Sequence, residues 1–467
     1  MGSLLVIVAA LLLPRPRSAS PSSSRVPANR ESDDTNSAAA RAARIADARR
    51  ALGVRSKPAA TKTPEQIVGE KLAFFARSRR KVAEALARRH GIDMPEDVKR
   101  FFDAVESGDW DRIQAAYKVI NGGDKSVSHG ANRPPGVNEL WSAIADAYGV
   151  AEQVHLWPAR QLLDYGNAVL GALPPGMAYV GGTDNGRWIP ELLNETGDGE
   201  PRIIITQNGL ADGMYLEYIT EQYGDRLTTL TQDDSQRAFQ DYIADARQRL
   251  EHDQQFPDEP KQVLPGENIS ETDGQITVSG QVAVMQINQT LLQMLLQKNP
   301  ELPFALQESF PLRATYPQAL PLGPLMQLNA QDAQDTFTGD LASQSVDYWQ
   351  TAAQNLLADA DSANSETVLK AYSKDAASAG NLLAAHGYTD QAQQAYRIST
   401  QLWPASPEAV HDLATLLQQT GHADQAAQLL DDFARNFPDP QPDAPPAPAA
   451  DPATPPPAEQ SSADAAQ

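Results

Sequence analysis

The 467-residue sequence contains no cysteine. This absence excludes disulfide bonds, thiolate metal sites, a cysteine nucleophile and a lipidated bacterial signal peptide. The seven histidines are scattered, and no two have the spacing of metal ligands on one helix, so we predict neither a metal site nor a cofactor. The nucleophile elbow G-x-S-x-G is also missing, and the pair Glu308-Ser309 is too common to indicate a nucleophile. The sequence therefore predicts no catalytic residue.

Long apolar runs are scarce. The run from Leu4 to Leu13 is too short to span a bilayer and has the length of a signal-peptide core. We predict that residues 1–20 are a signal peptide, with an uncleaved N-terminal membrane anchor or a misassigned start as the alternatives. The expected location is outside the cytoplasm, in the periplasm or associated with the bacterial cell envelope.

Basic residues are scarce after the first hundred positions. Residues 1–100 carry twenty Lys and Arg against ten Asp and Glu, whereas the remaining residues carry 18 against 50. An acidic surface repels nucleic acid and anionic membranes. We therefore predict no nucleic-acid partner.

The chain divides into segments of different composition. Residues 21–62 and 441–467 are rich in Ser, Pro and Ala and are predicted to be a disordered spacer and a disordered tail. Residues 63–172 are predicted to be helical, with Thr63 as the N-cap of the first helix and Gly91 as its end.

The first predicted helix carries a basic face. Three roles are open for this face: contact with anionic lipid, as in amphipathic basic helices, exposure to solvent, or docking on the acidic body of the chain. The residues concerned are Arg77, Arg79, Arg80, Lys81, Arg88 and Arg89.

Residues 173–330 alternate between strand and helix patterns, which predicts an α/β domain with a short, mostly parallel sheet. The segment 256–274 is predicted to be a loop. The predicted strands are 177–180, 202–206, 226–230, 275–288, 303–310 and 323–329.

Residues 345–440 contain an internal repeat with an offset of 34 residues, which is the tetratricopeptide period. The two repeats are 373–406 and 407–440, and the segment 345–370 is predicted to be a packing helix before them. The matched positions are Gly380 with Ala414, Leu383 with Leu417, Gly387 with Gly421, Ala392 with Ala426, Tyr396 with Leu430 and Pro404 with Pro438. Stacked helical hairpins bind proteins, so a protein partner is predicted.

The stretch "GGTDNG", residues 181–186, links a predicted strand to a predicted helix. Ligands bind at such strand ends in parallel sheets, but the stretch is neither a dinucleotide fingerprint nor a Walker loop. Asp184 is expected either to cap the following helix or to belong to a site for a sugar, a divalent cation or a phosphate. The predicted ligand-binding residues are Gly181, Gly182, Thr183, Asp184, Asn208 and Asp212.

Three segments carry a further resemblance: "PPGMAYVGGTDNGRWIPELL", "PRIIITQNGLADGMYLEYI" and "PFALQESFPLRATYPQALPLGPLMQLN". They resemble the soluble α/β region of bacterial membrane O-mannosyltransferase-like proteins, in which tetratricopeptide repeats follow. No multi-spanning section occurs in this sequence, so transfer activity is not carried over. The resemblance implies an envelope location and a role beside glycan or protein processing.

Two functions follow from these observations. The first is a non-catalytic adaptor that binds a protein through its repeats. The second is an enzyme, or a subunit of an enzyme, of glycan metabolism with its site around Asp184. The repeats and the missing catalytic motifs favour the first.

Overall fold

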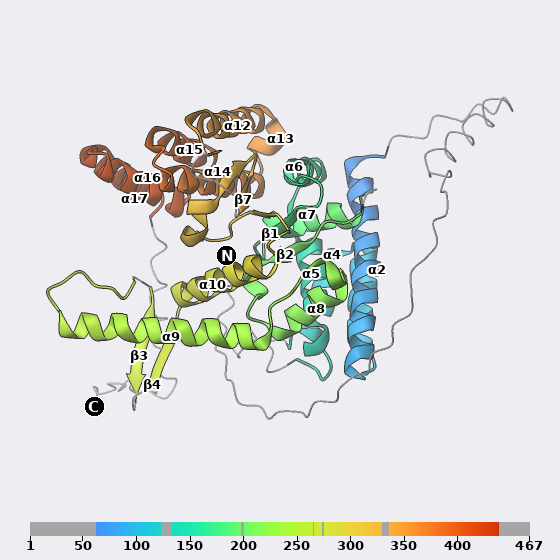
Figure 1. Ribbon diagram of the computed structural model, residues 1–467. Coiled ribbons are helices and arrows are strands. Elements are labelled where there is room, and N and C mark those ends of the chain that lie inside the picture. Colours follow the sequence, from blue (N-terminus) through green and yellow to red (C-terminus); the bar gives the residue numbers. More distant parts are fainter. Residues whose placement is uncertain are drawn as a thin grey trace, which may run out of the picture.

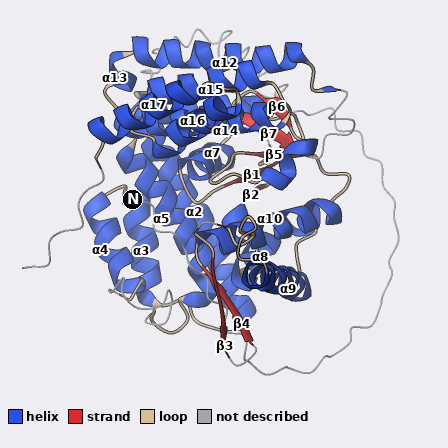
Figure 2. Ribbon diagram, turned by 90° about the vertical axis from the view of Figure 1, so that its left-hand side faces the viewer, coloured by secondary structure: helices blue, strands red, loops and turns tan. Residues whose placement is uncertain are grey.

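The computed structural model describes residues 62–122, 133–197, 200–264, 266–272, 275–328 and 336–438. The predicted signal peptide, the predicted tail and all of the predicted spacer except Lys62 lie outside these residues. The described chain is mainly helical and contains one small central sheet (Figures 1 and 2).

The N-terminal helical region follows the sequence prediction. Its first helix begins with a capping box, in which the Thr63 hydroxyl accepts from the Gln66 N–H and the Gln66 side chain accepts from the Thr63 N–H. It ends at Gly91, whose φ of 65° needs glycine. The elements are α2 (Pro64–His90), α3 (Glu96–Ser107), α4 (Trp110–Ile120), η1 (Asn138–Leu140), α5 (Trp141–Leu156) and α6 (Ala159–Ala172).

The basic face predicted for α2 is partly an internal docking surface. Arg79 is buried and pairs with Glu191 at 2.9 Å, so it does not belong to an exposed face. Arg77 pairs with Glu106 of α3 at 2.7 Å, and Arg80 pairs with Asp103 of the same helix. Docking on the body of the protein is thus seen for Arg79, whereas Arg77 and Arg80 form pairs at the protein surface.

The central sheet has the strand order β2-β1-β5-β7-β6. Strand β1 is parallel to β2 and to β5, whereas β7 is antiparallel to β5 and to β6. The predicted mostly parallel sheet is therefore a mixed sheet, because the tight turn at Gly323, with φ 58°, reverses the chain between β6 and β7. The strands are β1 (Ala178–Gly181), β2 (Ile204–Thr206), β5 (Phe304–Leu306), β6 (Leu320–Leu322) and β7 (Leu325–Leu328).

Three local predictions in the α/β part are wrong. Residues 226–230 form no strand, because the Asn299 side chain accepts from the Thr228 N–H and donates to the Thr228 carbonyl, each at 2.9 Å, where a neighbouring strand would bond. The predicted loop 256–274 contains β3 (Asn268–Thr272), which pairs with β4 (Gln275–Ser279). The predicted strand 275–288 stops at Gly280, whose φ is 98°.

The helices of the α/β part are α7 (Asn185–Glu195), α8 (Gly213–Tyr223), α9 (Gln232–Gln255) and α10 (Gln281–Lys298). The short elements η2 (Gln207–Gly209), η3 (Gly224–Arg226) and η4 (Arg313–Gln318) lie between them and the strands.

The C-terminal part consists of two helical hairpins preceded by a long helix. The second helices of the two hairpins begin 34 residues apart, at Thr389 and Ala423. The elements are α12 (Gly339–Ala358), α13 (Ala360–Ala363), α14 (Glu366–Ala385), α15 (Thr389–Leu402), α16 (Pro407–Gln419) and α17 (Ala423–Asn436).

The matched repeat positions occupy equivalent places in the two hairpins. Gly387 and Gly421 end the first helix of each hairpin with φ of 80° and 82°. A β-carbon on Gly380 would lie 2.5 Å from the Tyr396 ring, so this crossing requires a very small residue. The buried apolar members are Leu383, Ala392, Tyr396, Ala414, Leu417 and Ala426. Leu430 is partly buried, and Pro404 and Pro438 follow α15 and α17.

The sheet lies between the N-terminal helices and the hairpins (Figures 1 and 2). One continuous apolar core runs through all three, from Val68 of α2 to Ala426 of α17. Helix α14 packs on β6, β7 and η4 and so joins the first hairpin to the sheet.

Candidate functional site at the strand ends

The loop 181–186 follows β1 at the point where the strand order reverses. Strands β2 and β5 lie on opposite sides of β1, and both are parallel to it. The carboxyl ends of the three strands therefore meet at one edge of the sheet, where α/β proteins bind ligands. The segments that meet are 182–184, 207–208 and 307–309.

The glycines of this loop serve close packing. A β-carbon on Gly186 would lie 2.0 Å from the Gln307 Oε1 atom. One on Gly182 would lie 2.4 Å from the Ser309 β-carbon, and one on Gly181 would lie 2.9 Å from the Arg187 β-carbon. Close packing thus explains the glycines of this loop without a bound phosphate.

The structure brings together some of the predicted ligand residues. The Asn208 amide donates to the Thr183 hydroxyl at 3.1 Å. Asp184 caps α7 by accepting from the Gly186 N–H at 3.0 Å, as the capping interpretation expects. Asp212 likewise caps α8, accepting from the Met214 N–H at 2.9 Å. Within the described residues, no hydrogen bond or ion pair joins Asp212 to Thr183, Asp184 or Asn208.

Helix α14 supplies residues that the sequence reasoning missed. Lys374 forms an ion pair with Asp184, and the lysine side chain stays 33% exposed. Asp375 is buried and accepts from the Gln307 amide at 2.6 Å and from the Tyr165 hydroxyl at 2.9 Å. These residues stand about 190 positions after Asp184, and no local pattern links them to it. We call Asp184, Gln307, Glu308, Lys374 and Asp375 the strand-end cluster.

Glu308, which the sequence analysis set aside, accepts hydrogen bonds from three residues outside the named cluster. Its carboxylate accepts from the Leu312 N–H at 2.8 Å, the Tyr316 hydroxyl at 3.0 Å and the Ser378 hydroxyl at 3.2 Å. Burial raises the pKa of Glu308 to about 7, because these donors only partly offset the loss of water.

At Asp375, as at Glu308, the effect of burial on the pKa exceeds the effect of the hydrogen-bond donors. Burial raises the pKa of its carboxyl to about 6 against the opposing effects of Gln307, Lys374 and Tyr165. The cluster thus holds two buried carboxyl groups whose direct hydrogen-bond donors are neutral.

Several amide oxygens at this edge have no hydrogen-bond partner among the described residues. They are Gln207 Oε1, Gln307 Oε1 and Asn208 Oδ1. Buried acceptors are usually satisfied, so a small donor such as water fits here. The cavity beside Glu308 and Asp375 has a volume of about 10 Å³, which is enough for about one water molecule.

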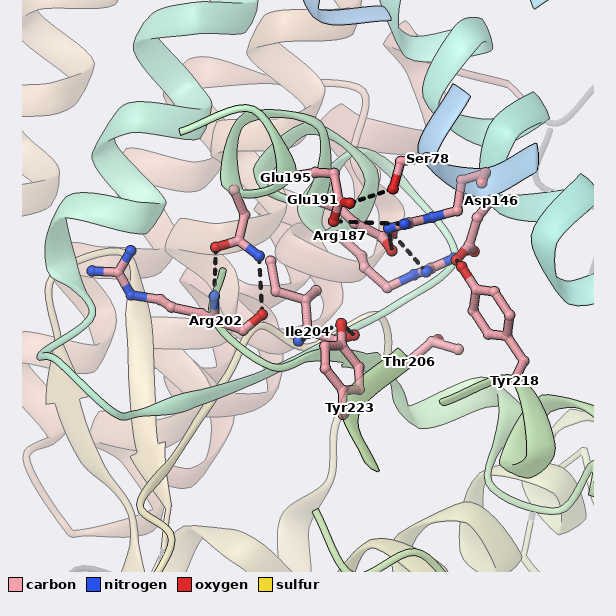
Figure 3. A network of polar contacts seen from close by, with 12 residues as sticks. Ser78, Asp146, Arg187, Glu191, Glu195, Arg202, Ile204, Thr206, Tyr218 and Tyr223 are labelled. Carbon is pink, nitrogen blue, oxygen red and sulfur yellow. Dashed lines mark hydrogen bonds and ion pairs between the residues drawn. The ribbon is translucent and has the colours of Figure 1, made fainter. Parts of the chain in front are cut away.

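A second buried polar group, shown in Figure 3, contacts the same loop through Arg187. The Arg187 guanidinium donates to the Gly182 carbonyl at 2.9 Å and pairs with Asp146 at 2.8 Å and with Glu191 at 2.9 Å. Arg79 completes the group through Glu191. We call Arg79, Asp146, Arg187 and Glu191 the charge-paired cluster.

The two carboxylates of the charge-paired cluster titrate differently. Burial opposes the ionisation of Asp146, but Arg187 and Arg79 outweigh it and hold its pKa below the ordinary value. Burial and the neighbouring Asp146 raise the pKa of Glu191 to about 7 against the attraction of both arginines. Each carboxylate nevertheless touches a guanidinium within 2.9 Å, and this direct pairing makes the cluster a structural support.

A larger hollow lies on the hairpins. It has a volume of about 380 Å³ and lies between the exposed sides of α12, the helix before the hairpins, and α15 of the first hairpin. Buried Ala353 and Ile398 line it together with exposed polar residues. We call it the glutamine groove, lined by Gln350, Ala353, Gln354, Gln394, Arg397, Ile398 and Gln401.

Comparisons with protein-family models, with curated proteins and with solved structures return no match for this chain. In the part of the chain that the structure describes, no helix has the length and apolar character of a membrane span. Across the same residues, no group of three or more His, Cys, Asp or Glu side chains is arranged to hold a metal ion.

Proposed function

We propose that the protein is an exported, non-catalytic adaptor of the bacterial cell envelope that binds a protein partner through its C-terminal hairpins. In this proposal the hairpins are tetratricopeptide repeats, which their 34-residue offset and matched small residues support. The proposed export rests on the apolar run from Leu4 to Leu13, and the envelope location also on the sequence resemblance.

One observation carries the binding part of the proposal. The glutamine groove has about 380 Å³ of space, whereas the cavity at the strand-end cluster has about 10 Å³. A protein segment needs room for several side chains, which the groove offers and the strand ends do not. Helix α14 is already covered by the sheet, so α12 and α15 present the accessible surface.

Affinity capture with the full-length protein tests this function. The variant Gln350→Ala/Gln394→Ala/Arg397→Glu alters exposed groove residues, and Asp184→Asn alters the strand-end cluster while keeping a helix cap. We expect the groove variant to weaken binding of the captured and purified partner at least tenfold, and Asp184→Asn to leave the affinity unchanged. Equal binding by the groove variant would contradict the proposal.

The alternative function is an enzyme, or a subunit of an enzyme, of glycan metabolism with its site around Asp184. Its specific support is the pair of buried carboxyl groups, Glu308 and Asp375, with pKa values of about 7 and about 6. Groups that titrate near neutral pH suit acid and base catalysis. The unpaired amide oxygens nearby would accept from sugar hydroxyls.

A thermal-shift screen of the full-length protein against sugars, nucleotides and divalent ions tests this alternative. A saturable shift that Asp184→Ala abolishes, with glycan hydrolysis or transfer that Glu308→Gln removes, would favour the enzyme. Absence of any shift would leave the strand ends with a structural role.

A further inference from the structure

The glutamine groove is rich in hydrogen-bond donors that the protein itself does not use. Within the described residues, the side chains of Gln350, Gln354, Gln401 and Arg397 form no hydrogen bond. Gln394 donates only to the Asp390 carbonyl, at 3.3 Å. A glutamine amide has two N–H groups and an arginine five, so the rim can donate to several acceptors of one bound segment.

Arg397 distinguishes this groove from the rest of the hairpins. Residues 339–438 contain four basic residues, and three of them form ion pairs: Lys370 with Glu366, Lys374 with Asp184, and Arg435 with Asp432. Arg397 is exposed and has no carboxylate partner among the described residues. A ligand with a carboxylate would supply the missing charge.

Residues 439–467 of the same chain have the complementary chemistry. They contain nine prolines, five acidic residues and no lysine or arginine. Proline has a carbonyl but no N–H, so a proline-rich backbone offers more acceptors than donors. The donor-rich rim of the groove matches this backbone, and the apolar floor of Ala353 and Ile398 matches proline and alanine side chains.

The segment is also long enough to reach the groove. It follows Pro438 directly, two residues after the end of α17. At about 3.1 Å per residue in the polyproline II form, 29 residues span roughly 90 Å. Helix α17 packs on α16, and α16 packs on α15, which lines the groove; packed helices lie about 8–10 Å apart, so this length exceeds the distance from α17 to the groove. A segment tethered to the same chain is present near the groove at a high effective concentration, so it can occupy the groove even when each of its contacts is weak.

We propose that residues 439–467 dock in the glutamine groove of their own chain, with one of their carboxylates on Arg397. This inference rests on the proposed function only in that the same groove would receive the protein partner. The docked segment then has to leave before the partner binds, which makes the segment an internal competitor.

The absence of cysteine allows a direct test in the full-length protein. The variant Gln354→Cys/Ala447→Cys places one thiol at the groove and one in the segment. The control, Gln418→Cys/Ala447→Cys, uses an exposed position on α16 that is nearer to the segment along the chain. Disulfide formation under mild oxidation is followed on non-reducing gels at low protein concentration, and thermal unfolding checks that each variant is folded.

We expect the groove pair to form an intrachain disulfide at least tenfold faster than the control pair, and Arg397→Glu to slow it to the control rate. Equal rates for the two pairs would overturn the inference. A disulfide-linked dimer whose yield rises with protein concentration would also overturn it, by showing that a second copy fills the groove.

The outcomes separate the two proposals. If the rates are equal but partner binding still depends on groove residues, this inference fails and the proposed function stands. If the intrachain disulfide forms rapidly but no partner depends on the groove, the inference stands and the proposed function fails.

Discussion

Two buried polar clusters flank the same glycine-rich loop, and they are built from different partners. In the charge-paired cluster, Asp146 and Glu191 each touch a guanidinium within 2.9 Å. In the strand-end cluster, Glu308 and Asp375 accept from hydroxyl, amide and backbone N–H groups instead. A single ammonium group, Lys374, belongs to that cluster and is paired with Asp184.

This difference makes the charge-paired cluster a structural support and the strand-end cluster a contact whose strength depends on pH. Buried charges that touch opposite charges hold two elements together, and removing one partner is costly. Buried carboxyl groups with neutral donors are tolerated when they are protonated and strained when they are ionised. The contact between α14 and the sheet is therefore expected to weaken as pH rises. The contact between α2, α5 and α7 also contains a carboxyl group with a raised pKa, Glu191, but two arginines pair with its carboxylate.

The largest effect is expected from breaking the charge-paired cluster. Arg187→Ala leaves Asp146 and Glu191 without a shared partner and removes the donor to the Gly182 carbonyl. We expect the free energy of unfolding to fall by about 3–5 kcal/mol, measured by urea denaturation. The control Arg226→Ala removes an exposed pair with Glu200 and should cost under about 1 kcal/mol. Equal losses would show that burial of the pair is unimportant.

The second effect is the pH dependence of the strand-end cluster. The pKa of Glu308 is about 7 in the folded protein, above its ordinary value of 4.5. Its contribution to stability is therefore complete below about pH 4.5 and is lost as pH rises through 7. Between pH 5 and pH 8 the wild-type protein should lose up to about 3 kcal/mol of stability through Glu308, because one pKa unit corresponds to about 1.4 kcal/mol. The variant Glu308→Gln should not show this part of the loss.

The matched control for this titration is Glu106→Gln, an exposed glutamate paired with Arg77. Urea denaturation at pH 5 and pH 8 should show the wild-type slope in the control and a smaller slope in Glu308→Gln. Unchanged slopes in both would contradict the assignment of Glu308 as a strained, buried carboxyl group.

The third effect concerns the glycine-rich loop that both clusters hold. Gly186→Ala places a β-carbon on the Gln307 amide and should displace it from Asp375, with a loss of about 1–3 kcal/mol. Gly213→Ala at the start of α8 meets no atom within 4 Å and should be neutral or slightly stabilising. A neutral Gly186→Ala would argue that the loop glycines serve something other than packing.

The sequence predicted most helices because their signals are local. Thr63, Pro64 and Gly91 mark the ends of α2, and Gly108 separates α3 from α4. The mixed sheet was missed because β6 and β7 have only three and four residues and their pairing is not encoded in either strand alone.

The site was predicted in part for the same reason. Asp184 was found because it ends a strand and precedes a helix, and this local pattern also gave its role as a cap. Lys374 and Asp375 could not be found, because only the packing of α14 on the sheet brings them there. Glu308 could have been found, because it lies near the end of a predicted strand, at the same edge of the sheet as Asp184.

The smallest effect is expected at Asp184. Asp184→Ala removes the cap of α7 and a partly exposed pair with Lys374, and should cost about 1 kcal/mol in thermal or urea unfolding. Asp184→Asn keeps the capping oxygen and should lose less than Asp184→Ala. If Asp184→Asn is as unstable as Asp184→Ala, the stability at this position comes from the charge of Asp184 and not from its capping oxygen.

The central claim is that binding takes place at the glutamine groove and that the strand ends pack α14 against the sheet without binding a partner. Its most direct test places a photo-crosslinking amino acid at Gln394 in one variant and at Asn208 in another, in the full-length protein in its native cells. We expect a defined protein adduct from position 394 and none from position 208. An adduct from position 208 with none from position 394 would contradict it.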